Sequence, residues 1–450
     1  MLVTLDEALA EGDVISISAF LNKNESKSAS AWLIFETGAT ADVAFGDEAN
    51  VNEALGGVVT TKTYVVTAEA AGSKTIKMTR GTAGTNLFIS KLEIDRLPVD
   101  ITLNVESGKD IATELAAAVE GKDVANITIN LVEGGSYTIG GSIVAPASLT
   151  INGNGATIDA SVLAATLITT PAGDLAEWFS GNFTVSGVTI KGLTQAFFTS
   201  AGKNYLYNDF VVDNSVVECT ASIVFDFRKG GVAKNFTIQN STFYAPTATG
   251  NSFYSSQSAQ KGTDAPDVTM QTFTFKNSTV YNFAYTKNFF THRSSNQTWL
   301  SFVIENSIFV NCGKSGQVVK GINQGQSGAN PTWVINGNIF NFDGADTSAA
   351  ESTGDEAEPV QNSIVGVVTF ADAAAGDFNG TFTYPFGTTA PESLGGDARW
   401  TITIAEGEDL SGIESIAVVA AQKDGKFFID GKLVIVRNGR QFNANGQILK

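Results

Sequence analysis

The sequence is short of positive charge and of long apolar runs, and each shortage excludes a class of protein. Lysine and arginine total 28 against 46 aspartate and glutamate residues, which gives a formal net charge of −18. Phosphate recognition needs a broad basic surface, so we expect no nucleic-acid partner. No apolar run is long enough to cross a bilayer, so we expect no transmembrane segment.

Cysteine is also scarce, with two residues in 450. Cys219 and Cys312 follow similar points of a repeat described below, three repeats apart. At the spacing of stacked strands that separation is about 14 Å, which is too long for a disulfide. We therefore expect both to be small buried apolar residues.

What the chain has in abundance is glycine, with 45 residues, and phenylalanine, with 30. Together with its low charge content, this composition favours an all-β protein rich in turns. The length allows two to four domains.

A short sequence motif is repeated through the middle of the chain. It consists of alternating apolar residues that end in Asn-Ser or in glycine. Copies recur about every 30 residues, which is the length of one structural repeat of two or three strands. Such a pattern predicts a right-handed parallel β-helix, in which the copies stack as successive coils. The closing residues are Gly153, Gly187, Asn214, Asn240, Asn277, Asn306 and Gly337.

Each copy opens with a large apolar side chain, and period-two alternation points this residue into the coil. We therefore expect a column of core aromatics. The closing Asn and Gly residues tolerate φ > 0, and we expect the four asparagines to stack as an internal hydrogen-bonded ladder. The aromatic column consists of Phe183, Phe210, Phe236, Phe273, Phe302 and Trp333.

We predict three domains: a jelly-roll-like β-sandwich over 1–97, the β-helix over 98–400 and a small β meander over 401–450. An amphipathic helix over 110–119 would cap the open end of the β-helix. The Gly- and Pro-rich run up to Asp397 is predicted to be irregular. The acidic residues of 343–362 are too scattered for a calcium loop, so we expect no bound cofactor, with calcium left open.

Three resemblances add to this interpretation. Segments 12–17, 71–76 and 84–94 resemble carbohydrate-binding-like modules of secreted polysaccharide lyases, and Trp32, Tyr64 and Phe88 could line a sugar site or belong to a core. Segment 430–447 resembles short C-terminal sorting domains of exported proteins from polysaccharide-degrading Gram-negative bacteria. This likeness implies an extracytoplasmic protein, secreted or on the outer surface, whose leader peptide has been removed.

The Asn-Ser repeats, with segments 225–230 and 396–400, resemble uncharacterised β-helix domains of the pectate-lyase-like superfamily. That resemblance implies the fold and an association with glycans. The Gly-His-Gly of polygalacturonase-like hydrolases is missing, because the single histidine, His292, follows Thr291. The run Asp-Phe-Arg-Lys-Gly that begins at Asp226 differs at both middle positions from the Asp-Phe-Ile-Phe-Gly of pectin methylesterases.

Counting from each closing Asn places Arg228, Tyr254 and Lys320 equally far along their coils, and Arg293 slightly further. If the register holds, they form a basic and aromatic stripe about 14 Å long, suited to uronate carboxylates and sugar rings. The alternatives are that Arg228 pairs with Asp226 and that His292 points inward. The candidate binding residues are Arg228, Lys229, Tyr254, His292, Arg293 and Lys320.

Three functions remain open at this point. The first is binding of an acidic, uronate-containing polysaccharide along the β-helix wall, by a protein that we expect to be monomeric. The second is a polysaccharide lyase, with Arg228, Arg293 or Lys320 as base and charge stabiliser. The third is a structural or adhesive surface module.

Overall fold

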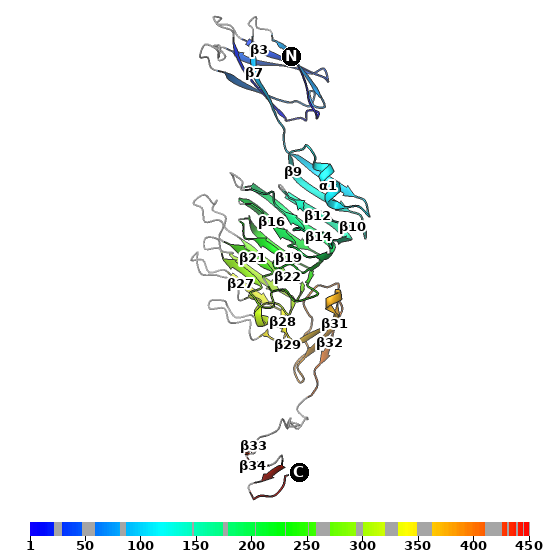
Figure 1. Ribbon diagram of the computed structural model, residues 1–450, viewed down its shortest axis with the longest axis vertical. Coiled ribbons are helices and arrows are strands. Elements are labelled where there is room, and N and C mark those ends of the chain that lie inside the picture. The colour runs from blue at the N-terminus through cyan, green and yellow to red at the C-terminus, as the bar shows by residue number, and fades with distance from the viewer. Residues whose placement is uncertain are drawn as a thin grey trace.

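Strands dominate the molecule, and their groups follow one another in chain order (Figure 1). The predicted all-β fold with a parallel β-helix is confirmed by the pairing described below. The domain boundaries stay predictions. The computed structural model describes residues 1–21, 29–46, 59–81, 87–145, 148–173, 179–202, 204–229, 231–250, 252–257, 271–293, 300–319, 332–348, 362–409, 425–429, 432–437, 440–443 and 445–449.

The N-terminal strands form two antiparallel sheets that share one apolar core, the arrangement of a β-sandwich. Ile15 and Ile17 of one sheet and Leu33 and Phe35 of the other are buried between them, as period two requires. The four-stranded sheet consists of β1 (Leu2–Thr4), β6 (Thr75–Arg80), β3 (Ala29–Phe35) and β4 (Thr40–Gly46). The three-stranded sheet consists of β5 (Thr60–Val65), β2 (Val14–Leu21) and β7 (Leu87–Asp95).

The middle of the chain coils repeatedly, and its strands pair in parallel with those of the next coil to form three walls. The long wall consists of β8 (Val99–Val105), β9 (Val124–Leu131), β12 (Ser148–Asp159), β14 (Phe179–Leu193), β16 (Tyr205–Asp213), β19 (Gly231–Gln239), β22 (Thr272–Lys276), β25 (Ser301–Glu305) and β27 (Thr332–Asn336). The covered wall consists of β10 (Ser136–Thr138), the ends of β12 and β14, β17 (Val216–Cys219), β20 (Thr242–Tyr244), β23 (Thr279–Tyr281), β26 (Ile308–Val310), β28 (Ile339–Phe342) and the antiparallel β29 (Ala345–Asp346). The short wall consists of β11 (Ile143–Val144), β13 (Ile168–Thr169), β15 (Phe198–Thr199), β18 (Phe225–Phe227), β21 (Tyr254–Gln257) and β24 (Phe290–Arg293).

The predicted aromatic column is confirmed. Its six members are Cα partners in successive coils and all are buried. The rings of Phe183 and Phe210 stack with centroids 4.0 Å apart, and those of Phe302 and Trp333 with centroids 4.7 Å apart. Contact between aromatic rings in successive coils therefore runs through the interior and fixes which face of each strand points inward.

The corners that follow this column correct one prediction. Asn214, Asn240, Asn277 and Asn306 adopt φ between 46° and 49°, as their tolerance of the left-handed region predicts. Their side chains, however, are exposed or half-buried, so the predicted ladder is not internal, although Asn277 does donate to Asn240 Oδ1 over 3.2 Å.

The following serines form that ladder instead. The Oγ atoms of Ser241, Ser278 and Ser307 each accept from the backbone N–H of the serine one coil earlier, over 3.1 Å from Ser215 to Ser241 and 3.2 Å from Ser241 to Ser278. Each hydroxyl also donates to a carbonyl two residues back, such as Ser241 to Gln239 over 2.6 Å. The small serine side chain fits inside the turn and satisfies buried backbone groups there.

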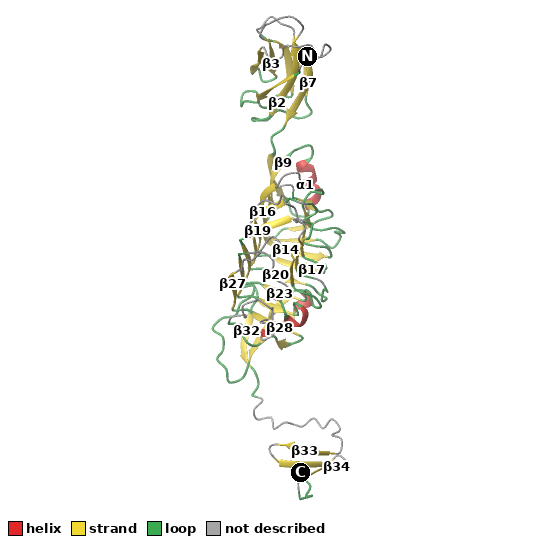
Figure 2. Ribbon diagram, turned by 90° about the vertical axis from the view of Figure 1, so that its left-hand side faces the viewer, coloured by secondary structure: helices red, strands yellow, loops and turns green. Residues whose placement is uncertain are grey.

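Helix α1 (Ile111–Val119) begins where the sequence predicts, with Asp110 as its N-cap accepting from Thr113 N over 2.8 Å. It lies at the end of the stack where β8 and β9 begin the coils (Figure 2). Ile111 and Leu115 belong to the apolar cluster that runs through the coils. This position fits the predicted capping role.

Residues 363–406, named the strap here, fold back over the covered wall instead of leaving it irregularly. They contain β30 (Val367–Asp372), β31 (Asp377–Tyr384) and β32 (Ile402–Glu406). Val368 and Phe382 pack on Ile308 and Ile339, while Phe378 packs on Val216 and Tyr244. Outward side chains of the wall from β17 to β28 therefore form further apolar clusters with the strap, which explains why many of them are large.

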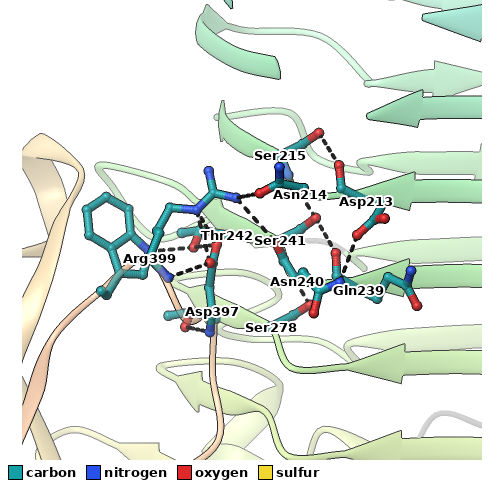
Figure 3. A network of polar contacts seen from close by, with 12 residues as sticks. Asp213, Asn214, Ser215, Gln239, Asn240, Ser241, Thr242, Ser278, Asp397 and Arg399 are labelled. Carbon is teal, nitrogen blue, oxygen red and sulfur yellow. Dashed lines mark hydrogen bonds and ion pairs between the residues drawn. The ribbon is translucent and has the colours of Figure 1, made fainter. Parts of the chain in front are cut away.

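A hydrogen-bonded clasp near the end of the strap joins several coils (Figure 3). Asp397 Oδ2 accepts from Thr242 Oγ1 over 2.7 Å, and Asp397 N donates to Thr279 Oγ1 over 3.1 Å. Arg399 Nη2 donates to Asn214 Oδ1 over 3.0 Å and to the carbonyl of Asn240 over 3.2 Å. Gly395 lies so close to the backbone of Asn306 that a Cβ would clash there.

Two smaller predictions have clear outcomes. The C-terminal strands form an antiparallel meander, made of β33 (Gly425–Ile429), β34 (Lys432–Arg437) and β35 (Arg440–Asn443). Cys219 and Cys312 are free and buried, as predicted. Burial raises the pKa of the Cys219 thiol to about 12, so this residue behaves as a small apolar side chain.

Candidate functional site

The short wall carries most of the predicted site residues, although their register differs from the predicted stripe. Phe227 of β18 pairs with Ser256 of β21, and Gln257 pairs with Arg293 of β24. Arg228 directly follows β18, so Arg228, Gln257 and Arg293 follow the same edge of the wall in successive coils. The side chains of His292 and Arg293 and the whole of Lys320 lie outside the described residues.

Tyr254 does not belong to an exposed stripe, and that prediction is wrong. It is the Cα partner of Phe225 and Phe290, whose side chains point inward. Its ring lies 5.1 Å from that of Phe236 and 5.4 Å from that of Phe227, centroid to centroid. Burial raises the pKa of its hydroxyl, as expected of a core tyrosine.

Arg228 is exposed at the end of β18 and forms the ion pair that the sequence left open as an alternative. Its Nε donates to Asp226 Oδ1 over 2.9 Å, and its Nη2 donates to Asp226 Oδ2 over 2.7 Å. The backbone N–H of Arg228 also donates to Asp226 Oδ1, over 3.0 Å. This two-pronged hydrogen bond raises the pKa of Arg228.

Asp226 lies in a row of small polar side chains along the outer face of the short wall. The row follows from alternation, because the residue before each member belongs to the buried core. All members are half-buried except Ser255, which is buried. In order along the wall the row consists of Thr169, Thr199, Asp226, Ser255 and Thr291, and each is the Cα partner of the next.

Two members of this row hydrogen-bond to neighbouring hydroxyls. Thr199 Oγ1 lies 3.1 Å from Thr166 Oγ1, and Thr291 Oγ1 lies 2.5 Å from Ser252 Oγ. Hydroxyls and a carboxylate at regular strand spacing offer a series of hydrogen-bond partners to a chain of hydroxyl-bearing rings. Exposed Lys229 follows Arg228 in the chain.

The other two walls offer less to a ligand. From β17 to β28 the covered wall packs against the strap. On the long wall many polar side chains hydrogen-bond to one another: Asn235 donates to Asp209 over 2.9 Å, and Lys276 pairs with Glu305 over 2.8 Å. The middle column of that wall can be compared with the row on the short wall, because it also carries paired threonines such as Thr237 and Thr274.

The three aromatics considered for a sugar site on the N-terminal sheets do not form one cluster. Tyr64 packs on Phe35 beside the core, with ring centroids 5.5 Å apart. Phe88 is exposed and stacks on Phe20 on the outer face of the three-stranded sheet. Trp32 is half-buried on a strand of the other sheet. A shared sugar site of Trp32, Tyr64 and Phe88 is therefore not supported.

Within the described part of the chain, no three His, Cys, Asp or Glu side chains come together as metal ligands would. Of the acidic segment 343–362, Asp343 accepts from the Tyr285 hydroxyl and Asp346 from the backbone N–H groups of Ser348 and Gly366. Residues 349–361 lie outside the described ranges. None of the helices described is long and apolar enough to span a membrane.

Comparison with known proteins adds nothing to the fold described above. No family model matches the chain, and no curated protein matches it. Among solved structures the chain is similar to the catalytic domain of a GH87 α-1,3-glucanase in complex with nigerose, at 12% identity and a TM-score of 0.23, covering 80% of this chain and 71% of that one. A substituted form of that domain matches at 12% identity and a TM-score of 0.21, over 70% and 68%. At such TM-scores nothing about this chain follows from the likeness.

The packing of the strap is the part that sequence reasoning missed. Its signal was present in outward residues that follow three of the corners: Val216, Ile308 and Ile339 are apolar where a solvent-facing wall would carry polar side chains.

Proposed function

We propose that this chain is an exported polysaccharide-binding protein whose ligand lies along the short wall. The observation that carries the proposal is the in-register row around Asp226, with Thr199 and Thr291 on either side. Sugar chains are recognised mainly through hydroxyl groups, which pair well with hydroxyl and carboxylate side chains. Export remains part of the proposal, supported by the resemblance of the tail to sorting domains.

The class of glycan is less well supported than binding itself. The sequence suggested uronates because cations were expected to line the stripe. Arg228 instead donates to Asp226, so the one cation of the stripe whose side chain is described already has a carboxylate partner. We therefore propose a neutral polysaccharide first and keep uronates as the alternative.

A lyase is the second candidate, and Arg228 suits it poorly. A catalytic base must lose its proton near the working pH, whereas the hydrogen bond to Asp226 raises the pKa of Arg228. Arg293 and Lys320 remain as the residues that a lyase would use.

Affinity electrophoresis in native gels tests the binding proposal. The protein is run through neutral polysaccharides and polygalacturonate, together with a Thr199→Val/Thr291→Val variant and a control, Thr237→Val/Thr274→Val, on the long wall. We expect the unmodified protein and the control to be retarded by at least one glycan, and the short-wall variant to lose this retardation. Equal retardation of both variants would move the site elsewhere.

The same glycans separate the remaining functions. A lyase would release unsaturated products from polygalacturonate, which absorb in the ultraviolet. Their absence, with no retardation on any glycan, would favour the structural or adhesive module.

A further inference from the structure

Asp226 has a feature that a simple hydrogen-bonding row does not require. It is the only charged member of the row, and it holds the guanidinium of Arg228 through two side-chain hydrogen bonds. The pair is accessible, since 45% of the Arg228 side chain is exposed. A ligand passing along the row therefore meets an anion whose compensating cation is already engaged.

We infer that Asp226 is a specificity-determining residue that excludes acidic glycans from the short wall, an inference that rests on the proposed function. A uronate carboxylate approaching the row faces the Asp226 carboxylate, and like charges brought together across an interface are costly. The charge of Arg228 offsets this repulsion only in part, because two of its N–H groups already donate to Asp226. Neutral sugars face no such repulsion and can still hydrogen-bond to the hydroxyl groups of the row.

Removing the charge should invert the preference. In Asp226→Asn the amide oxygen can still accept from the backbone N–H of Arg228, which bonds Asp226 Oδ1 over 3.0 Å, so the turn is retained. The guanidinium loses its ionic partner and becomes available for bidentate binding of a carboxylate. Exposed Lys229 beside it adds a second cation.

The experiment compares four proteins on polygalacturonate and on a neutral polysaccharide that retards the unmodified chain. They are the unmodified protein, Asp226→Asn, Asp226→Asn/Arg228→Gln, and the control Asp209→Asn, which removes one exposed carboxylate from the long wall. We expect Asp226→Asn to gain about tenfold in affinity for polygalacturonate, the size of effect expected when a close like-charge contact is removed. The double variant lacks the Asp226 carboxylate as well but has no freed guanidinium, so it should show a smaller gain, and Asp209→Asn should show none.

The outcomes separate the two proposals. If Asp226→Asn binds polygalacturonate no better than the unmodified protein, or if Asp209→Asn gains equally, the inference is overturned while neutral binding stands. If the unmodified protein binds no glycan, the proposed function fails. Binding of polygalacturonate by Asp226→Asn alone would still support the exclusion of acidic glycans by Asp226. Should the Asn variant melt early, Asp226→Ser takes its place in the comparison, with the same expected gain.

Discussion

Two Asp-x-Arg turns in this molecule share their local geometry and differ in their surroundings. In Asp226-Phe-Arg228 and in Asp397-Ala-Arg399 the arginine N–H donates to the aspartate Oδ1, over 3.0 Å and 3.1 Å. In both turns the arginine Nε donates to the same oxygen over 2.9 Å. Three consecutive residues are thus enough to build the ion pair, wherever the turn lies.

The surroundings decide what each pair does. The Asp397 side chain is 3% exposed and the Arg399 side chain 26%, and both reach residues more than 150 positions away in sequence. Asp226 and Arg228 are 15% and 45% exposed, and every hydrogen bond given above for their side chains stays within the turn. The first pair joins the strap to the coils, whereas the second presents charge to solvent, where a ligand can meet it.

The largest expected effect is on the buried pair. Asp397→Ala removes the carboxylate that Thr242 and Arg399 donate to, and leaves those groups covered by the strap. Removing one partner of a buried pair costs about 3–5 kcal/mol, so we expect a large loss in the free energy of unfolding by urea. A loss below about 1 kcal/mol, the ordinary value of a surface pair, would show that the clasp does not hold the strap.

A smaller effect should follow from the hydroxyl that the clasp shares. Thr242 Oγ1 donates to Asp397 and accepts from Trp400 Nε1, over 2.7 Å each. Thr242→Val keeps the shape, removes one of several hydrogen bonds of the buried Asp397 and takes the partner from the half-buried Trp400 Nε1, which should cost about 1–3 kcal/mol. Thr237→Val on the long wall is the matched control and should stay within about 0.5 kcal/mol in the same denaturation.

The aromatic column and the Asn-Ser corners show where sequence reasoning succeeds and where it stops. Period-two alternation identified the inward column from Phe183 to Trp333, because a register error of one residue would expose it. Alternation cannot decide which side chain of an Asn-Ser corner lies inside; backbone geometry turns Asn240 outward and Ser241 inward.

Counting residues from the corners failed for a different reason. The connection from Asn240 to Tyr254 is longer than that from Asn214 to its partner strand residue, Phe225. Connections in a β-helix vary in length, whereas the strands keep register through pairing, so a fixed count placed the buried Tyr254 beside the exposed Arg228. The clasp was out of reach because Asp397 meets Thr242 only through tertiary folding.

The corners that support the clasp give a further test. Asn240 has φ of 49°, and its carbonyl accepts from Arg399. Asn240→Ala should cost about 1–2 kcal/mol, because alanine is disfavoured in the left-handed region. Asn240→Gly should recover part of this loss in thermal melts, since glycine adopts that conformation freely; equal losses would assign the effect to the amide bonds with Asp213 and Asn277.

The smallest stability effect should come from the exposed pair, and its smallness separates the two turns. Arg228→Gln removes a guanidinium that bonds Asp226 alone among the described residues, in a pair open to solvent, so we expect less than about 1 kcal/mol of change in the free energy of unfolding. The matched Arg399→Gln loses bonds to Asn214 and Asn240 as well and should cost more. If the two substitutions cost the same, the surroundings do not set the role of the turn, and the assignment of one pair to structure and the other to ligand selection would lose its basis. If Arg228→Gln leaves stability unchanged, then a change in its glycan binding reflects the charge that the wall presents and not a loosened fold.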